Sequence, residues 1–558
     1  MTRPTDTDPS DRQGARPTIR WSLFLAVSLA LSAPLALAPA PEVWGQDLFE
    51  GSPFEETQPE GEPEGEPGDA ANEDGSTTPQ MQEFTPRNRI ESISPRTTSE
   101  ALAAYNEGLA LKERQDLMGA IGKFQEVKRL DRMFVPAYYE LGRAYIELKD
   151  YANAQSELDF LKQMMQNPPP EIFEAQGELD IKSKAYTQAA EVLSYAANLD
   201  YLNVELATKA GEARLLESLT VRGRTAVQQA ITQAIALLDR ALKIQPDNAQ
   251  ALLLRGRANL VKARGGDELD LDKAIADLTK AVELEPKNIQ SAAQLGQALY
   301  SRAQTEATRH LGSTKKVLAD LPRAVELLQR YATEELAATT KEQRQEKNKE
   351  RVPDEPSAFQ ALATAGAASI KLATELQGAE RKKYLQLGEE LCQKSIAEEP
   401  RSPDGYFQLG LAYRLMGDYP RAIESFSHAI SIDEGNPESY LRRGICYYYA
   451  GQRGQAASDL RRALDFQPDA RASFWLGLIN ASNGQHEEAI RLFSVALDLT
   501  RNNYPLASLN RGLSYLQLGD YDRAERDFGD TLKRDPQNRQ AQQLLESLRR
   551  TRRLTADN

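Results

Sequence analysis

Residues 403–434 read PDGYFQLGLAYRLMGDYPRAIESFSHAISIDE, and this stretch decides the fold. Its first half carries apolar or small residues three and four positions apart, which predicts a helix with one buried face. These residues are Tyr406, Leu409, Gly410 and Tyr413. Gly417 stands where this helix must end, because glycine accepts the left-handed backbone that ends helices. A second helix follows, and its buried face is predicted to carry Ala422, Phe426 and Ala429.

The same pattern recurs along the chain at a nearly constant period. Gly410, Gly444, Gly477 and Gly512 are separated by 34, 33 and 35 residues. Towards the other end, Gly108, Gly142, Gly177 and Gly211 are separated by 34, 35 and 34 residues. This period is the length of one helix–turn–helix unit, so the chain is predicted to contain about eleven such units. Several units end in a helix-breaking proline, at Pro246, Pro286, Pro400, Pro468 and Pro536.

One unit matches a known family pattern at nearly every marked position, through Tyr440, Gly444, Tyr447, Ala456, Leu460, Ala463 and Pro468. The sequence therefore resembles tetratricopeptide-repeat (TPR) proteins over roughly residues 99–536. The resemblance implies an all-α, right-handed superhelical solenoid of TPR-like hairpins. In that fold the first helix of each hairpin lines a groove that binds segments of other proteins.

Spacing and composition divide the repeat region into four parts. TPR-like repeats with insertions are expected at 99–331, where three units are longer than the rest. A charged insertion at 332–356 is expected to be a solvated helical extension or a loop, because Lys341–Arg351 mixes both signs of charge. TPR-like repeats resume at 357–536, and the unit around Gly366 departs most from the pattern. Residues 537–558 are expected to form a capping helix and tail, with Ala541, Leu544, Leu545 and Leu548 on one face.

The N-terminal 98 residues read as targeting and linker sequence. Arg16 and Arg20 precede the apolar run Trp21–Leu37, so residues 1–45 are expected to be a signal peptide cleaved before Gln46. The alternative is an uncleaved membrane anchor, which would be the protein's membrane contact. Residues 46–98 are expected to be a disordered acidic Pro/Gly-rich linker. The protein is therefore expected to be exported, to the periplasm or another extracytoplasmic bacterial compartment.

Composition and motifs give no indication of chemistry. The formal net charge of the 558-residue chain is −14, so no nucleic-acid partner is expected. The chain has three histidines and two cysteines, and they form no pattern typical of a metal site or a nucleophile. Cys392 and Cys446 are expected to be small buried residues without a disulfide. We therefore expect no catalytic residue, no cofactor and no metal, and we do not expect an enzyme.

The resemblance implies that the groove is lined by first-helix positions beside the packed ones. In the last four units these positions form a mostly apolar strip, made of Phe407, Leu411, Arg414, Leu441, Ile445, Tyr448, Phe474, Leu478, Leu509 and Leu513. An extended or helical apolar segment of another protein is expected to dock there. The alternative is that these side chains only pack against neighbouring helices.

These observations predict a non-catalytic scaffold in the cell envelope that binds other proteins in the groove of its repeats. Two alternatives remain open at this point. One is an accessory factor for envelope assembly, secretion or polymer export. The other is a solenoid that binds a small molecule or a glycan.

Overall fold

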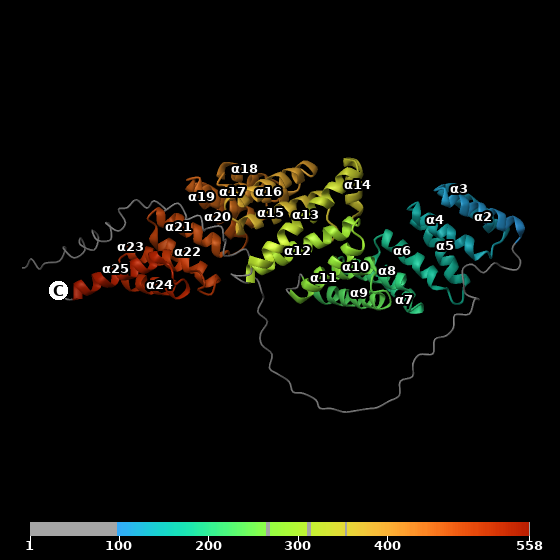
Figure 1. Ribbon diagram of the computed structural model, residues 1–558, viewed down its shortest axis with the longest axis horizontal. Helices are drawn as coiled ribbons and strands as arrows, with labels where there is room; N and C mark the ends of the chain where they lie inside the picture. The colour runs from blue at the N-terminus through green and yellow to red at the C-terminus, as the bar shows by residue number, and fades with distance from the viewer. Residues whose placement is uncertain (1–97, 264–267, 310–313, 352–353, 557–558) are drawn as a thin grey trace, which may run out of the picture. The chain divides into compact units, whose positions relative to one another are not determined.

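The computed structural model describes residues 98–263, 268–309, 314–351 and 354–556, and Figure 1 shows their arrangement. These residues form 24 helices and no strand. The predicted signal peptide and nearly all of the predicted acidic linker lie outside the described residues. The chain divides into an N-terminal unit that ends at Ala365 and a C-terminal unit that begins at Gly366.

Six helical hairpins follow one another in the described part of the N-terminal unit. Their first helices are α2 (Ser99–Glu113), α4 (Val135–Glu147), α6 (Pro170–Lys182), α8 (Val204–Ser218), α10 (Ala249–Ala263) and α12 (Ile289–Arg309). Their second helices are α3 (Leu117–Leu130), α5 (Tyr151–Met164), α7 (Tyr186–Leu199), α9 (Arg224–Ile244), α11 (Glu268–Leu284) and α13 (Thr314–Ala338). The short helix α14 (Lys341–Glu350) comes after the sixth hairpin.

Five further hairpins follow, and the first helix of the first one spans the boundary between the units. Their first helices are α15 (Ala358–Glu375), α17 (Pro403–Met416), α19 (Pro437–Tyr449), α21 (Ala470–Ser482) and α23 (Pro505–Gln517). Their second helices are α16 (Gly378–Glu398), α18 (Tyr419–Ile432), α20 (Arg453–Phe466), α22 (His486–Leu499) and α24 (Tyr521–Arg534). The last helix is α25 (Arg539–Ala556).

The described residues thus confirm the predicted all-α fold and contain eleven helical hairpins. The extra residues of the long units lengthen helices: α9 has 21 residues, α11 has 17 and α13 has 25, whereas α18 has 14. The terminal cap is also confirmed. Helix α25 packs on α24 and buries Ala541 and Leu548, while Arg549 donates to Glu525 on α24 at 2.8 Å.

Close contact within each hairpin explains the periodic glycines. A Cβ atom at Gly410 would lie 2.8 Å from a ring carbon of Phe426, which is fully buried on the second helix. The equivalent position at Gly512 would lie 2.8 Å from the ring of Phe528. Carbon atoms cannot approach this closely without strain, so any larger residue would push the two helices apart.

The turn between the two helices of a hairpin needs one left-handed residue. Gly417 holds this place with φ 81°, and the side chain of Asp418 then accepts a hydrogen bond from the Arg421 backbone N–H at 3.2 Å to begin α18. The first three hairpins make the same turn without glycine: Lys149, for example, has φ 62° and is followed by the capping residue Asp150. The turn is therefore set by the tertiary fold as well as by glycine.

Neighbouring hairpins are joined mainly where the second helix of one packs on the first helix of the next, as α18 does on α19, and more lightly through their first helices. Among helices that are not consecutive in the chain, the sustained contacts are α4 with α6, α6 with α8, α8 with α10, α10 with α12, α17 with α19, α19 with α21, and α21 with α23. The first helices therefore lie side by side and form one face in each unit. We call this the first-helix face.

An arginine clamp holds each of several hairpins to the one before it. In the C-terminal unit, Arg443 on α19 donates to both oxygens of Asp459 on α20, at 2.7 and 2.9 Å, and to Ser427 Oγ on α18 at 3.0 Å. Arg511 makes the same three bonds to Asp527 and Ser494. In the N-terminal unit, Arg255 bridges Asp277 and Asp239, and Arg302 bridges Asp320 and Asp272. Each clamp joins three helices through bidentate, charge-assisted hydrogen bonds.

Candidate protein-binding surface

All ten residues that were predicted to line a groove lie on first helices of the C-terminal unit. Helices α17, α19, α21 and α23 present them at positions three and four residues apart. This spacing places them on one side of each helix. Contacts between successive first helices then bring the four helices into one row. The predicted groove would run along this row of four helices.

Four of the ten residues are buried in the packing between helices. Leu441, Ile445, Phe474 and Leu509 are between 1% and 6% exposed. Leu441 and Ile445 belong to a cluster that includes Leu460 of α20. In this conformation these four side chains hold the hairpins together and do not reach the surface.

The other six residues are half-buried and keep part of their surface open. They are Phe407, Leu411, Arg414, Tyr448, Leu478 and Leu513. The ring of Phe407 meets the ring of Phe426 edge-on, with the centroids 5.6 Å apart. Binding at these six positions remains a prediction. The surface that they expose is smaller than the strip of ten residues that was predicted.

An aromatic cluster extends this surface at the C-terminal end of α19. The ring of Tyr449 stacks on that of Tyr419, with the centroids 5.2 Å apart and the planes 10° from parallel. Tyr448 and Tyr449 both meet Trp475 of α21, at 5.1 and 5.5 Å between centroids. We call Tyr419, Tyr448, Tyr449 and Trp475 the aromatic cluster. Tyrosine and tryptophan dominate the binding energy of many protein interfaces, because they bury large areas with few rotatable bonds.

Only one member of the aromatic cluster was among the predicted residues. Tyr449 is 40% exposed, and it follows Tyr448 in a run of three tyrosines that begins at Tyr447. That run was the available signal in the sequence. Burial raises the pKa of Tyr448, and nearby Arg453 only partly opposes this, so the hydroxyl stays protonated at neutral pH and can donate a hydrogen bond.

Groups capable of chemistry are scattered in the described residues. No three side chains among His, Cys, Asp and Glu come together there as metal ligands. Cys392 and Cys446 are buried and unbridged, and burial raises the pKa of each thiol to about 12. No helix in the described ranges has both the length and the apolar composition to cross a membrane.

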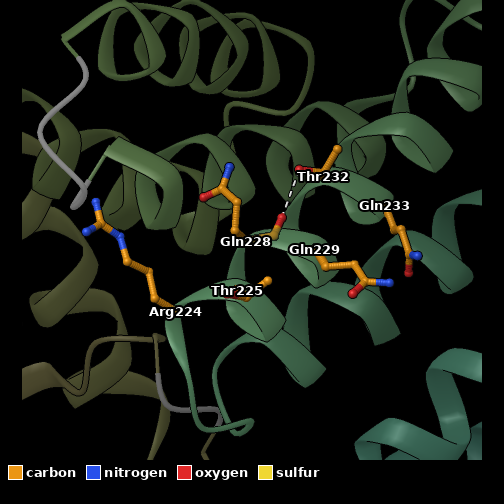
Figure 2. Close-up of a pocket in the computed structure, with 6 residues that line it drawn as sticks. All are labelled: Arg224, Thr225, Gln228, Gln229, Thr232 and Gln233. Carbon is orange, nitrogen blue, oxygen red and sulfur yellow. Dashed lines mark hydrogen bonds between the residues drawn. The ribbon is translucent and has the colours of Figure 1, made fainter. Parts of the chain in front are cut away.

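A shallow depression lies along α9 of the N-terminal unit. Figure 2 shows its lining residues, Arg224, Thr225, Gln228, Gln229, Thr232 and Gln233. Its volume of about 750 Å³ is in the range of ligand pockets, but all six residues come from one helix. A small-molecule site normally brings polar groups together from several elements over an apolar lining. The depression is therefore not a candidate site.

Comparison with known families identifies the repeats. Sequence models of the tetratricopeptide repeat match residues 223–289, 441–504 and 509–545, and related models match 403–436 and 135–159. The chain therefore contains tetratricopeptide repeats in both units, as the resemblance implied.

Individual relatives match shorter parts of the chain. BBSome complex member BBS4 of Bos taurus is 31% identical over 142 residues, which are 25% of this chain and 27% of that protein. The lipoprotein NlpI homolog of Haemophilus influenzae is 31% identical over 97 residues, which are 17% of this chain and 31% of that protein. The chain thus spans about a quarter to a third of the length of these curated relatives.

Two solved structures are also similar to this chain. The structure of MamA is 24% identical and covers 28% of this chain and 91% of its own, with a TM-score of 0.27. The Cut9–Hcn1 hetero-tetramer of the APC/C is 13% identical and covers 82% of this chain and 91% of its own, with a TM-score of 0.37.

Proposed function

We propose that this chain is a non-catalytic scaffold that binds segments of other proteins on the first-helix face of its C-terminal unit. The observation that carries the proposal is the aromatic cluster, which leaves Tyr449 40% exposed beside Tyr419, Tyr448 and Trp475. Half-buried apolar side chains on α17 and α21 continue this surface. An apolar segment of a partner would gain by removing these rings from water, at roughly 25 cal/mol per Å².

The similar proteins support a role in assembling protein complexes. One of them is, by its name, a member of a multi-subunit complex. The stacked hairpins also suit such a role, since each adds a strip of surface without needing a core shared by the whole chain.

Changing the aromatic cluster is expected to weaken partner binding. Partners would first be identified by crosslinking in the native cell and then purified, and their affinity for the full chain would be measured by calorimetry. Tyr449→Ala combined with Trp475→Ala should lower the affinity at least tenfold, because interface aromatics often contribute 2 kcal/mol or more, roughly a thirtyfold effect.

Phe466→Ala is the matched control, since Phe466 is also 40% exposed but lies at the end of the second helix α20. Its affinity should stay within twofold of the unchanged chain. Equal losses in both variants would contradict the proposed surface. Saturable binding of a glycan that the aromatic variant retains would favour the small-molecule alternative instead.

We further propose that the scaffold works in the bacterial cell envelope, to which residues 1–45 direct it. The support is the sequence Trp21–Leu37, an apolar run after two arginines, and the relative that is by its name a lipoprotein. Mass spectrometry of the purified protein should find Gln46 as the N-terminus, and fractionation should place it outside the cytoplasm. A cytoplasmic chain that begins at Met1 would contradict this proposal.

A further inference from the structure

A segment of the N-terminal unit returns to the first-helix face of that same unit. Its described residues are α14, Arg351 and 354–357, and we call it the strap. The carbonyl of Lys349 accepts a hydrogen bond from Lys184, at the turn between α6 and α7, at 3.2 Å. Beyond this point the strap reaches α10 and α12. It therefore passes over hairpins that lie far earlier in the chain.

The strap is anchored on Arg257, in the middle of α10. The Arg257 guanidinium donates to both carboxylate oxygens of Asp354, with Nε 2.8 Å from Oδ2, and lies 3.7 Å from Glu355. The side chains of Arg257 and Asp354 are only 6% and 5% exposed. Gln294 on α12 donates to the backbone carbonyl of Asp354 at 2.9 Å. Asp354, in a turn of the chain, is thus bound as a ligand would be, by the two-pronged guanidinium and by a hydrogen bond to its backbone carbonyl.

A second set of bonds holds Arg351 and Pro356 of the strap to α13. Arg351 pairs with Glu335, and it donates to the hydroxyl of Tyr331 at 2.8 Å and to the carbonyl of Pro356. The hydroxyl of Tyr331 donates to the same carbonyl at 2.7 Å. These bonds fix Arg351 and Pro356, which lie on either side of Asp354, and so position Asp354 beside Arg257.

Helix α14 is held by polar contacts: Arg344 donates to the backbone carbonyls of Leu336 and Thr339, and Lys347 pairs with Glu335 at 3.1 Å. Helix α14 reads KEQRQEKNKE and has no apolar residue, and none of its residues with described exposure is buried. Glu212 on α8 adds a further acid near Arg257: burial raises its pKa, Arg257 opposes this, and Glu355 adds to the rise. Three carboxylates thus lie near one guanidinium, and of these Asp354 is the one that is hydrogen-bonded to it. A helix held by polar contacts and without a buried apolar side chain can open while the hairpins stay folded. Pro356 and Ser357, at the other end of the strap, are buried.

We propose that Arg257 is the anchor of a peptide-binding site, and that the strap fills this site as an internal ligand. The partner that fits is an acidic peptide segment with adjacent carboxylates, which replaces Asp354 and Glu355. The chemistry follows from the geometry, because a bidentate guanidinium selects a carboxylate. This site lies in the N-terminal unit and is separate from the surface proposed above for the C-terminal unit.

The experiment uses a fluorescent peptide with the sequence of the strap, KEQRQEKNKERVPDEPS, and the full-length chain. In the unchanged protein the tethered strap competes at an effective concentration on the order of millimolar, so the peptide should bind weakly. The variant Asp354→Asn with Glu355→Gln weakens the tethered copy while keeping its shape. Fluorescence anisotropy should show that this double variant binds the peptide at least tenfold more tightly than the unchanged protein does.

Two controls test the site itself. Adding Arg257→Gln to that variant should abolish the gain, and a peptide with asparagine and glutamine in place of the two acids should not bind. Trypsin should also cleave after Lys349 and Arg351 several times faster in the double variant, while circular dichroism stays unchanged. A double variant that folds but shows neither tighter binding nor faster cleavage would overturn the proposal, and so would tighter binding that Arg257→Gln leaves intact.

Discussion

Replacing Arg443 by methionine should lower the free energy of opening of the α19–α20 hairpin by about 3 kcal/mol. Methionine keeps the apolar length of the side chain but leaves the carboxylate of Asp459, which is 7% exposed, without its bidentate partner. It also removes the hydrogen bond to Ser427 of the preceding hairpin. Hydrogen exchange of the full chain, measured by mass spectrometry, gives the opening free energy of each helix and checks this value.

Arg421→Met is the matched control for that prediction. Arg421 pairs with Asp418 in the same unit, but its side chain is 53% exposed. Exposed ion pairs typically contribute less than 1 kcal/mol, so exchange in α18 should change little. If both substitutions had the same small effect, the arginine clamp would not be what joins the hairpins.

Gly512→Ala should destabilise the α23–α24 hairpin by about 1–3 kcal/mol. The new methyl group would lie 2.8 Å from the ring of Phe528, which is fully buried. Either the ring leaves its preferred rotamer or the two helices separate. The loss should appear as faster hydrogen exchange in both helices and as a lower midpoint of guanidinium unfolding.

Gly529→Ala in the same hairpin should have the opposite effect. Gly529 lies within α24, and a Cβ atom there would have no other atom within 4 Å. Alanine favours the helix over glycine by about 1 kcal/mol, so this variant should be slightly more stable. Equal destabilisation by the two alanines would mean that close helix contact is not the reason for glycine at position 512.

Local sequence patterns predicted the hairpins because the relevant contacts lie within one repeat. Gly410 and Phe426 are 16 residues apart, and their sizes already imply two helices in close contact. The pair between Arg257 and Asp354 joins residues 97 positions apart. Each looks like an ordinary charged residue in its own stretch, so the strap could not be predicted from spacing.

The candidate surface was only partly predictable for a similar reason. Positions such as Leu441 and Tyr448 lie on the same side of α19, and the sequence of one repeat does not say which of them the next helix covers. Leu441 is 1% exposed, whereas Tyr448 meets Trp475 and remains half-buried. Exposure here depends on how α21 packs against α19, which is a property of two neighbouring repeats.

The buried thiols have a consequence for how the protein tolerates oxidants. With a pKa of about 12, Cys392 and Cys446 carry roughly one thiolate per ten thousand molecules at pH 8, and the thiolate is the form that reacts. Sulfenic acid formation, mixed disulfides and covalent dimers all begin with that form. The folded repeats can therefore keep two reduced cysteines in surroundings where an exposed thiol would be consumed.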